Sequence, residues 1–174
     1  MENKIAEAMK LIGKWNLYVT EGEPLTQDEL ATLRAGGTID RVIRAYKYCN
    51  IIPTVARQQI AKALSNNIAT KAEIAINYQE LGTGVTTPAN SDTGLETPDG
   101  TTRKAVSSLA YSSNKVTVTC FWVAGEATGT WKELGTFING TASSNSGTLF
   151  NHVSIDVVVG ASNSLTLDGE VTIN

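Results

Sequence analysis

The chain has 174 residues, a formal net charge of −3 and a charged fraction of 18%, below the roughly one quarter that is typical of globular domains. This length fits one domain with a small appendage. DNA- and RNA-binding surfaces carry clustered Lys and Arg, so this charge balance, with a sequence pI near 5.2, argues against a nucleic-acid partner. No run of about 18 apolar residues is present, and the opening segment lacks the apolar core of a secretion signal, so neither membrane insertion nor secretion is indicated and assembly in a cytoplasm is expected. The two cysteines, Cys49 and Cys120, lie in strand-like runs and are predicted to be reduced thiols in the core.

The opening segment is predicted to form a short amphipathic helix over residues 2–12, which Gly13 ends. The apolar residues that recur at helical spacing are Ile5, Ala8, Met9, Leu11 and Ile12. A helix of this length is marginal alone in water, so it must dock either on its own domain or on a neighbouring subunit.

Two further elements complete the expected N-terminal extension, residues 1–37, which we interpret as a docking element. Alternating apolar residues predict a strand over 15–20. Thr26 and Glu29 then fit a capping box that opens a second helix, and Gly36-Gly37 closes it.

The next stretch combines strands with one helix. A long strand over 39–52 is predicted to end at Pro53, and Thr54 is expected to cap a helix over 55–64. Strand signal resumes at Glu73.

Residues 82–102 are the least regular part of the chain. Their prolines and glycines forbid long regular elements, and a loop of this length in a compact domain is usually functional or part of an interface. A further strand is predicted over 103–112.

The last third, from Lys115 onward, is predicted to form four antiparallel strands separated by turn residues. The side chains expected in the core are Trp122, Val153, Ile155, Leu165, Leu167 and Val171. The chain is therefore predicted to be mainly β. We expect an antiparallel β-sandwich or jelly-roll-like domain over 38–174, with the helix that follows Pro53 covering one edge or open end.

Residues that could carry chemistry lack the partners that chemistry needs. His152, the single histidine, lies in a strand with no nucleophile or orienting group placed beside it, so a structural or surface role is favoured. Asp92, Glu96 and Asp99 could offer oxygen ligands to Ca²⁺, but their spacing is not that of a helix-loop-helix calcium site. A solvated acidic loop is favoured there, and cation binding stays open.

Four carboxylates near the last strands could form a pair of the glycosidase type, although the sequence does not show which of them face one another. They are Glu126, Glu133, Asp168 and Glu170. The tryptophans Trp15, Trp122 and Trp131 fall in strands, where core packing is favoured over an exposed platform for sugars. We therefore expect a non-enzymatic protein with no catalytic, cofactor-binding or metal-binding residues.

Several segments share their order with one known family. They are Asn50–Arg57, Ile60-Ala61, Ile76–Tyr78, Leu81–Gly84, Pro88–Thr93, Gly129–Glu133 and Leu165–Leu167. Over 39–174 the chain thereby resembles a family of small structural proteins of tailed bacteriophages, whereas residues 1–37 do not share the resemblance.

The resemblance implies a virion protein of the tail, neck or fibre, or one that decorates the capsid, assembled in the host cytoplasm. Such a protein binds copies of itself, for example as a trimer, and other virion proteins. The alternative is a module at the tip of a phage appendage that binds a receptor or glycan on the host surface. The residues do not distinguish head, neck, baseplate and fibre.

Overall fold

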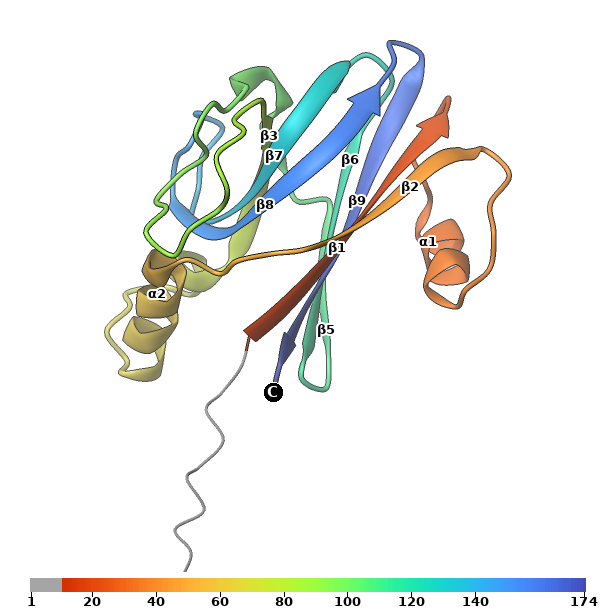
Figure 1. Cartoon of the computed structure of the whole chain (residues 1–174). Coiled ribbons are helices and arrows are strands. Elements are labelled where there is room, and N and C mark those ends of the chain that lie inside the picture. Colours follow the sequence, from red (N-terminus) through yellow and green to blue (C-terminus); the bar gives the residue numbers. More distant parts are fainter. Residues whose placement is uncertain (1–10) are drawn as a thin grey trace, which may run out of the picture.

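The computed structural model describes residues 11–174, which form two antiparallel β-sheets facing one another as a sandwich (Figure 1). The predicted mainly-β, antiparallel sandwich is thus confirmed. Within 11–174, no helix is long and apolar enough to cross a membrane.

One sheet has five strands. In spatial order these are β2 (Val42–Cys49), β1 (Leu11–Glu21), β9 (Asn163–Ile173), β6 (Lys115–Trp122) and β5 (Ser108–Ser112). The pairing of β1 with β9 is the longest in this sheet and runs from Leu11 opposite Ile173 to Glu21 opposite Asn163. The first and last described strands are therefore central neighbours.

The other sheet has four strands. In spatial order these are β4 (Lys104–Ala105), β3 (Ile76–Gly82), β7 (Gly129–Ile138) and β8 (Thr148–Val159). Register shifts interrupt the pairing of β7 with β8 at two places, so the alternation of side chains along β8 changes face near its start.

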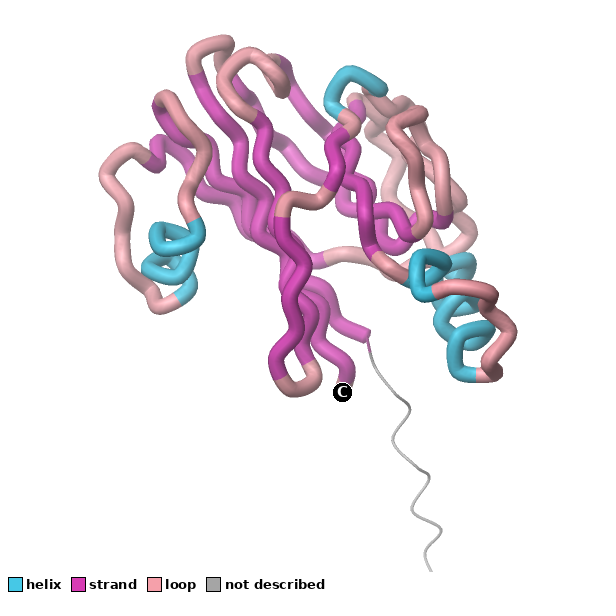
Figure 2. Tube along the Cα trace, turned by 180° about the vertical axis from the view of Figure 1, so that it is seen from behind, coloured by secondary structure: helices cyan, strands magenta, loops and turns pink. Residues whose placement is uncertain are grey.

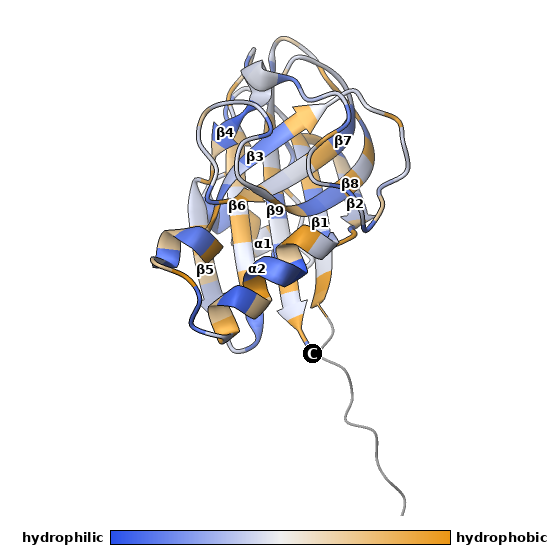
Figure 3. Ribbon diagram, turned by 90° about the vertical axis from the view of Figure 1, so that its left-hand side faces the viewer, coloured by the Kyte–Doolittle hydropathy of each residue, from blue (hydrophilic) through white to orange (hydrophobic). Residues whose placement is uncertain are grey.

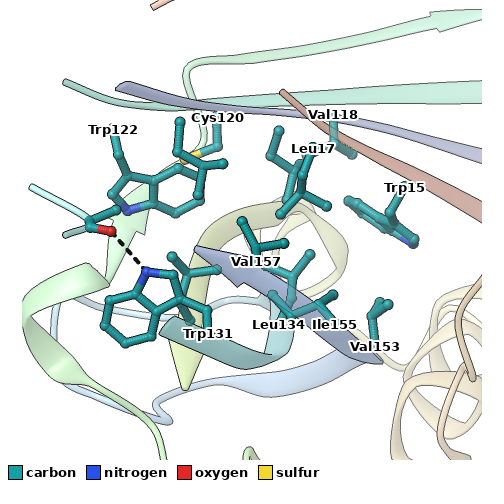
Figure 4. Packing of buried hydrophobic residues seen from close by; sticks show 14 of the residues in the cluster. Trp15, Leu17, Val118, Cys120, Trp122, Trp131, Leu134, Val153, Ile155 and Val157 are labelled. Carbon is teal, nitrogen blue, oxygen red and sulfur yellow. Dashed lines mark hydrogen bonds between the residues drawn. The ribbon is translucent and has the colours of Figure 1, made fainter. Parts of the chain in front are cut away.

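The main core fills the space between the two sheets (Figure 4). The six side chains predicted for the core are all buried, which confirms the period-two interpretation of these strands. The indole of Trp15 lies against Gly169, where an added Cβ would come within 2.1 Å of the ring. The other two indoles are also buried, and their N–H groups donate to the carbonyl oxygens of Thr102 and Ala127.

Helix α1 (Gln27–Arg34) lies against the outer face of the five-stranded sheet (Figure 2). The predicted capping box between Thr26 and Glu29 opens it, and Leu30 is fully buried against Tyr18. This small second core fixes the segment between β1 and β2 on the sheet.

Helix α2 (Thr54–Leu64) and the short 3-10 helix η1 (Lys71–Ile74) lie near one end of the sandwich, while a second 3-10 helix, η2 (Gly100–Thr102), precedes β4 (Figure 1). The prediction that Thr54 caps α2 was wrong. The cap position is Pro53, which makes no side-chain cap bond, and Thr54 is the first helical residue.

The predicted helix over residues 2–12 was wrong at its end. Leu11 and Ile12 belong to β1, because β9 offers their backbone a partner strand that a sequence pattern does not show; residues 2–10 lie outside the described residues. The expected boundary near residue 37 does not follow the sheet either, since β1 is a central strand of the sandwich.

Two other expectations also need correction. The strand expected over 103–112 is two strands, β4 and β5, which belong to different sheets, so the chain crosses from one sheet to the other between them. Cys120 is buried, and burial raises the pKa of its thiol to about 12, whereas Cys49 is exposed at the end of the edge strand β2 and is not a core residue.

Candidate functional site

An apolar groove lies between α2 and the end of the five-stranded sheet where β1 begins and β9 ends. Its volume is about 380 Å³. The sheet side of the groove is formed by Leu11, Leu109, Val116, Val171 and Ile173. The opposite side is formed by Ile60, Ala63 and Leu64 of α2 together with Ile74 and Ala75. Figure 3 shows α2 lying across the ends of β6, β9 and β1, with apolar segments on the helix and on the strands.

The groove exists because the strands of the five-stranded sheet extend beyond the end of the four-stranded sheet. The floor is formed by residues at or near the ends of the four-stranded sheet, Ile76, Ile138 and Phe150. The strands of the other sheet continue further, and their inward rows remain apolar up to Leu11 and Ile173. The inner face of this overhang therefore meets α2 rather than a sheet.

Several large apolar side chains of the groove are open to solvent. Leu64 is 78% exposed and Leu109 is 47% exposed, while Ile74 and Ile173 are about 40% exposed. Tyr111, two residues beyond Leu109 on the same face of the edge strand β5, is 85% exposed. Isolated exposed apolar residues are ordinary, but a set that lines one groove makes this groove a candidate binding surface.

The long loop over 82–102 is held on the four-stranded sheet by a buried ionic cluster around His152. The Nδ1 atom of His152 lies 2.7 Å from the Oδ2 atom of Asp92 in the loop, and its Nε2 atom lies 3.0 Å from the Oε2 atom of Glu133. Glu133 also accepts hydrogen bonds from the backbone N–H groups of Gly84, Glu96 and Thr97. We call this set of contacts the His152 clamp.

The electrostatics of the His152 clamp favour its charged form. Burial alone would lower the pKa of His152, but the hydrogen bonds and charges of Glu133 and Asp92 outweigh it and raise the pKa above 6.5. For Glu133, burial alone would raise the pKa, yet the hydrogen bonds from His152 and the three amides lower it. Both ring nitrogens of His152 contact carboxylates, so the imidazole fastens the loop and is not placed to act on a nucleophile.

A second ionic cluster fixes the neighbouring loop over 139–147. The side chains of Glu80 and Arg103 are fully buried, and the Nη1 atom of Arg103 lies 2.7 Å from the Oε2 atom of Glu80. The guanidinium stacks 4.2 Å from the centre of the Phe137 ring and donates to the carbonyl oxygens of Thr141 and Ser146. Sequence patterns did not point to this pair, because Glu80 lies in β3, Arg103 lies between η2 and β4, and no motif links them.

Each of the four candidate carboxylates contacts a partner outside this set of four. Glu133 belongs to the His152 clamp, and Glu126 pairs with Lys104. The carboxylate of Asp168 accepts hydrogen bonds from the Nε and Nη2 groups of Arg34 in α1, and the neighbouring Glu170 pairs with Lys115.

The acidic loop is likewise occupied by protein donors. Asp92 binds His152 and the N–H of Ala89, Glu96 binds the backbone and hydroxyl of Thr86, and Asp99 binds Thr101. Within residues 11–174, no three His, Cys, Asp or Glu side chains gather so that they could hold a metal ion. The three tryptophans are buried and present no platform for a sugar.

Comparisons with models of protein families, with curated proteins and with solved structures give no match. The open apolar groove is the most distinctive surface of the described residues.

Proposed function

We propose that the protein is a non-enzymatic structural component of a bacteriophage virion, either in the tail, neck or fibre or on the capsid. It acts through assembly with copies of itself and through contacts with other virion proteins. The observation that carries this proposal is the apolar groove beside α2, where four large side chains, those of Ile74, Ile173, Leu109 and Leu64, stay exposed in a single chain. Covering such a surface with a partner is favourable by about 25 cal/mol for each Å² of apolar area removed from water.

The two ionic clusters support the same proposal. An assembled protein needs loops of fixed shape, because a mobile loop must lose conformational entropy whenever it binds. The loop over 82–102 is fastened through the His152 clamp and through Asn90, whose carbonyl oxygen accepts from the N–H of Thr54 at the start of α2. The loop over 139–147 is fastened through Arg103 and Glu80. The resemblance of residues 39–174 to phage structural proteins is the reason for proposing a phage virion as the assembly.

The test is to purify phage particles from induced host cells on a density gradient and quantify peptides of this chain by mass spectrometry. We expect the chain to sediment with the particles at a constant number of copies and to stay attached in high salt. If the chain stays among the soluble proteins while known virion proteins sediment, the proposed function is wrong.

A further inference from the structure

We propose that the apolar groove receives residues 1–10 of a second copy of the same chain, so that copies in the assembly exchange their N-terminal segments. The inference deepens the assembly role proposed above and rests on it. It names the partner of the groove and the part of that partner that binds.

The chemistry of residues 1–10 matches that of the groove. Ile5, Ala8 and Met9 are apolar and follow the i, i+3, i+4 spacing that places side chains on one face of a helix. The other residues of the segment are mostly polar or charged, among them Glu2, Lys4, Glu7 and Lys10. A segment of this kind can direct a narrow apolar stripe into a groove while its other face stays in water.

The length of the segment also fits. Ten residues in helical form span roughly 15 Å, about the length of three helical turns. The facing helix α2 has 11 residues, and its groove residues Ile60, Ala63 and Leu64 follow the same spacing. Two short helices of similar length can therefore lie against one another over the inner face of the overhanging sheet.

The direction of β1 favours a second copy over the chain's own segment. Leu11 is paired with Ile173 and already lies at the rim of the groove, at the end of β1. To enter its own groove the chain would have to reverse directly before Leu11. Such a reversal takes about two to six residues, which would draw Ala8 and Met9 into the turn and remove two of the three apolar anchors.

Exchange between copies keeps all three anchors available. Each copy offers one segment and one groove, so a closed symmetric assembly leaves neither unfilled. Contacts between identical subunits most often close in this way.

Cysteine cross-linking tests the proposal directly. The full-length chain would carry Ile5→Cys and Leu64→Cys with Cys49→Ser, because Cys49 is exposed whereas Cys120 is buried and its pKa of about 12 keeps it unreactive. We expect mild oxidation to link two or more chains through disulfides that a reductant reverses. The matched control replaces Leu64→Cys by Lys62→Cys and should link far less, because Lys62 does not line the groove and helical spacing places it on the opposite side of α2. A disulfide within single chains, or no disulfide, would overturn the proposal.

A mass measurement gives a second, independent test. We expect light scattering at micromolar concentration to show an oligomer for the unmodified chain and a single chain of 18.5 kDa for the double variant Ile5→Asp, Met9→Asp. The control Asn3→Asp, Ala6→Asp adds the same charge away from the apolar stripe and should keep the oligomer. An unchanged mass in the first variant would mean that a small apolar ligand, a different protein or the chain's own segment fills the groove, and the proposal would be wrong.

The virion role and the exchange of N-terminal segments can be refuted independently. A chain that cross-links between copies but is absent from purified particles would retain the exchange and refute the virion role. A chain that is present in particles, whose mass and incorporation do not respond to Ile5→Asp, Met9→Asp, would retain the virion role and refute the exchange.

Discussion

Removal of the Glu133 charge from the His152 clamp should destabilise the protein strongly. In Glu133→Gln the imidazolium keeps one carboxylate partner, Asp92, instead of two, and three backbone N–H groups lose a charged acceptor. Glu133 is 1% exposed, so solvent cannot replace the lost interactions. Breaking a buried charge pair from one side costs about 3 to 5 kcal/mol, which for a domain of this size corresponds to a fall in Tm of roughly 10 °C.

The pH dependence of this effect follows from the two shifted groups. The raised pKa of His152 means that its contribution is fully present below about pH 6.5 and is lost as pH rises through the pKa of the folded state. The lowered pKa of Glu133 means that its contribution is present above about pH 4.5 and is lost as pH falls through the pKa of the folded state. The clamp should therefore stabilise the protein most between these limits, and Glu133→Gln should flatten the pH profile.

The assay is thermal and urea denaturation of both proteins from pH 4 to pH 9, with limited proteolysis to follow the loop over 82–102. The matched control is Glu126→Gln, because Glu126 pairs with Lys104 at a half-exposed site where such pairs contribute about 1 kcal/mol or less. A cost below about 1 kcal/mol for Glu133→Gln, or a loop no more sensitive to protease, would refute the reasoning.

Three further changes test the core and the second ionic cluster. Leu167→Ala, at a fully buried position of β9, should cost about 2 to 5 kcal/mol in urea denaturation, and a cost below about 1 kcal/mol would show that its face is not tightly packed. Gly169→Ala should lower Tm, because the new Cβ would lie only 2.1 Å from the Trp15 ring. The indole would have to move, and a shift of the tryptophan fluorescence maximum would report this movement. Arg103→Met should cost about 3 to 5 kcal/mol by leaving Glu80 buried without its partner, whereas Arg103→Met with Glu80→Leu should recover most of that loss, and equal costs for the single and double variants would contradict this view of the pair.

The sequence was most informative where structure depends on neighbouring residues. Alternating side chains in β9 identified a strand and its packed face, and Leu165, Leu167 and Val171 are buried as expected. The Thr26 capping box located the start of α1 because its bonds join residues three positions apart.

What the sequence did not show depends on partners far apart in the chain. Leu11 and Ile12 follow helical spacing, and only the pairing with β9, more than 150 residues later, makes them part of a strand. His152 meets Asp92 and Glu133 at separations of 60 and 19 residues, and no single-sequence pattern encodes such a meeting. The groove depends on where strands of two different sheets end, so it could not be predicted either.

A cryo-EM map of the phage particle would test the central claim most directly. We predict that the two-sheet sandwich fits density repeated by the symmetry of the particle, and that density from a neighbouring copy fills the groove between α2 and the ends of β1 and β9. A particle without this density, or a sandwich whose groove faces open solvent in every copy, would contradict the account.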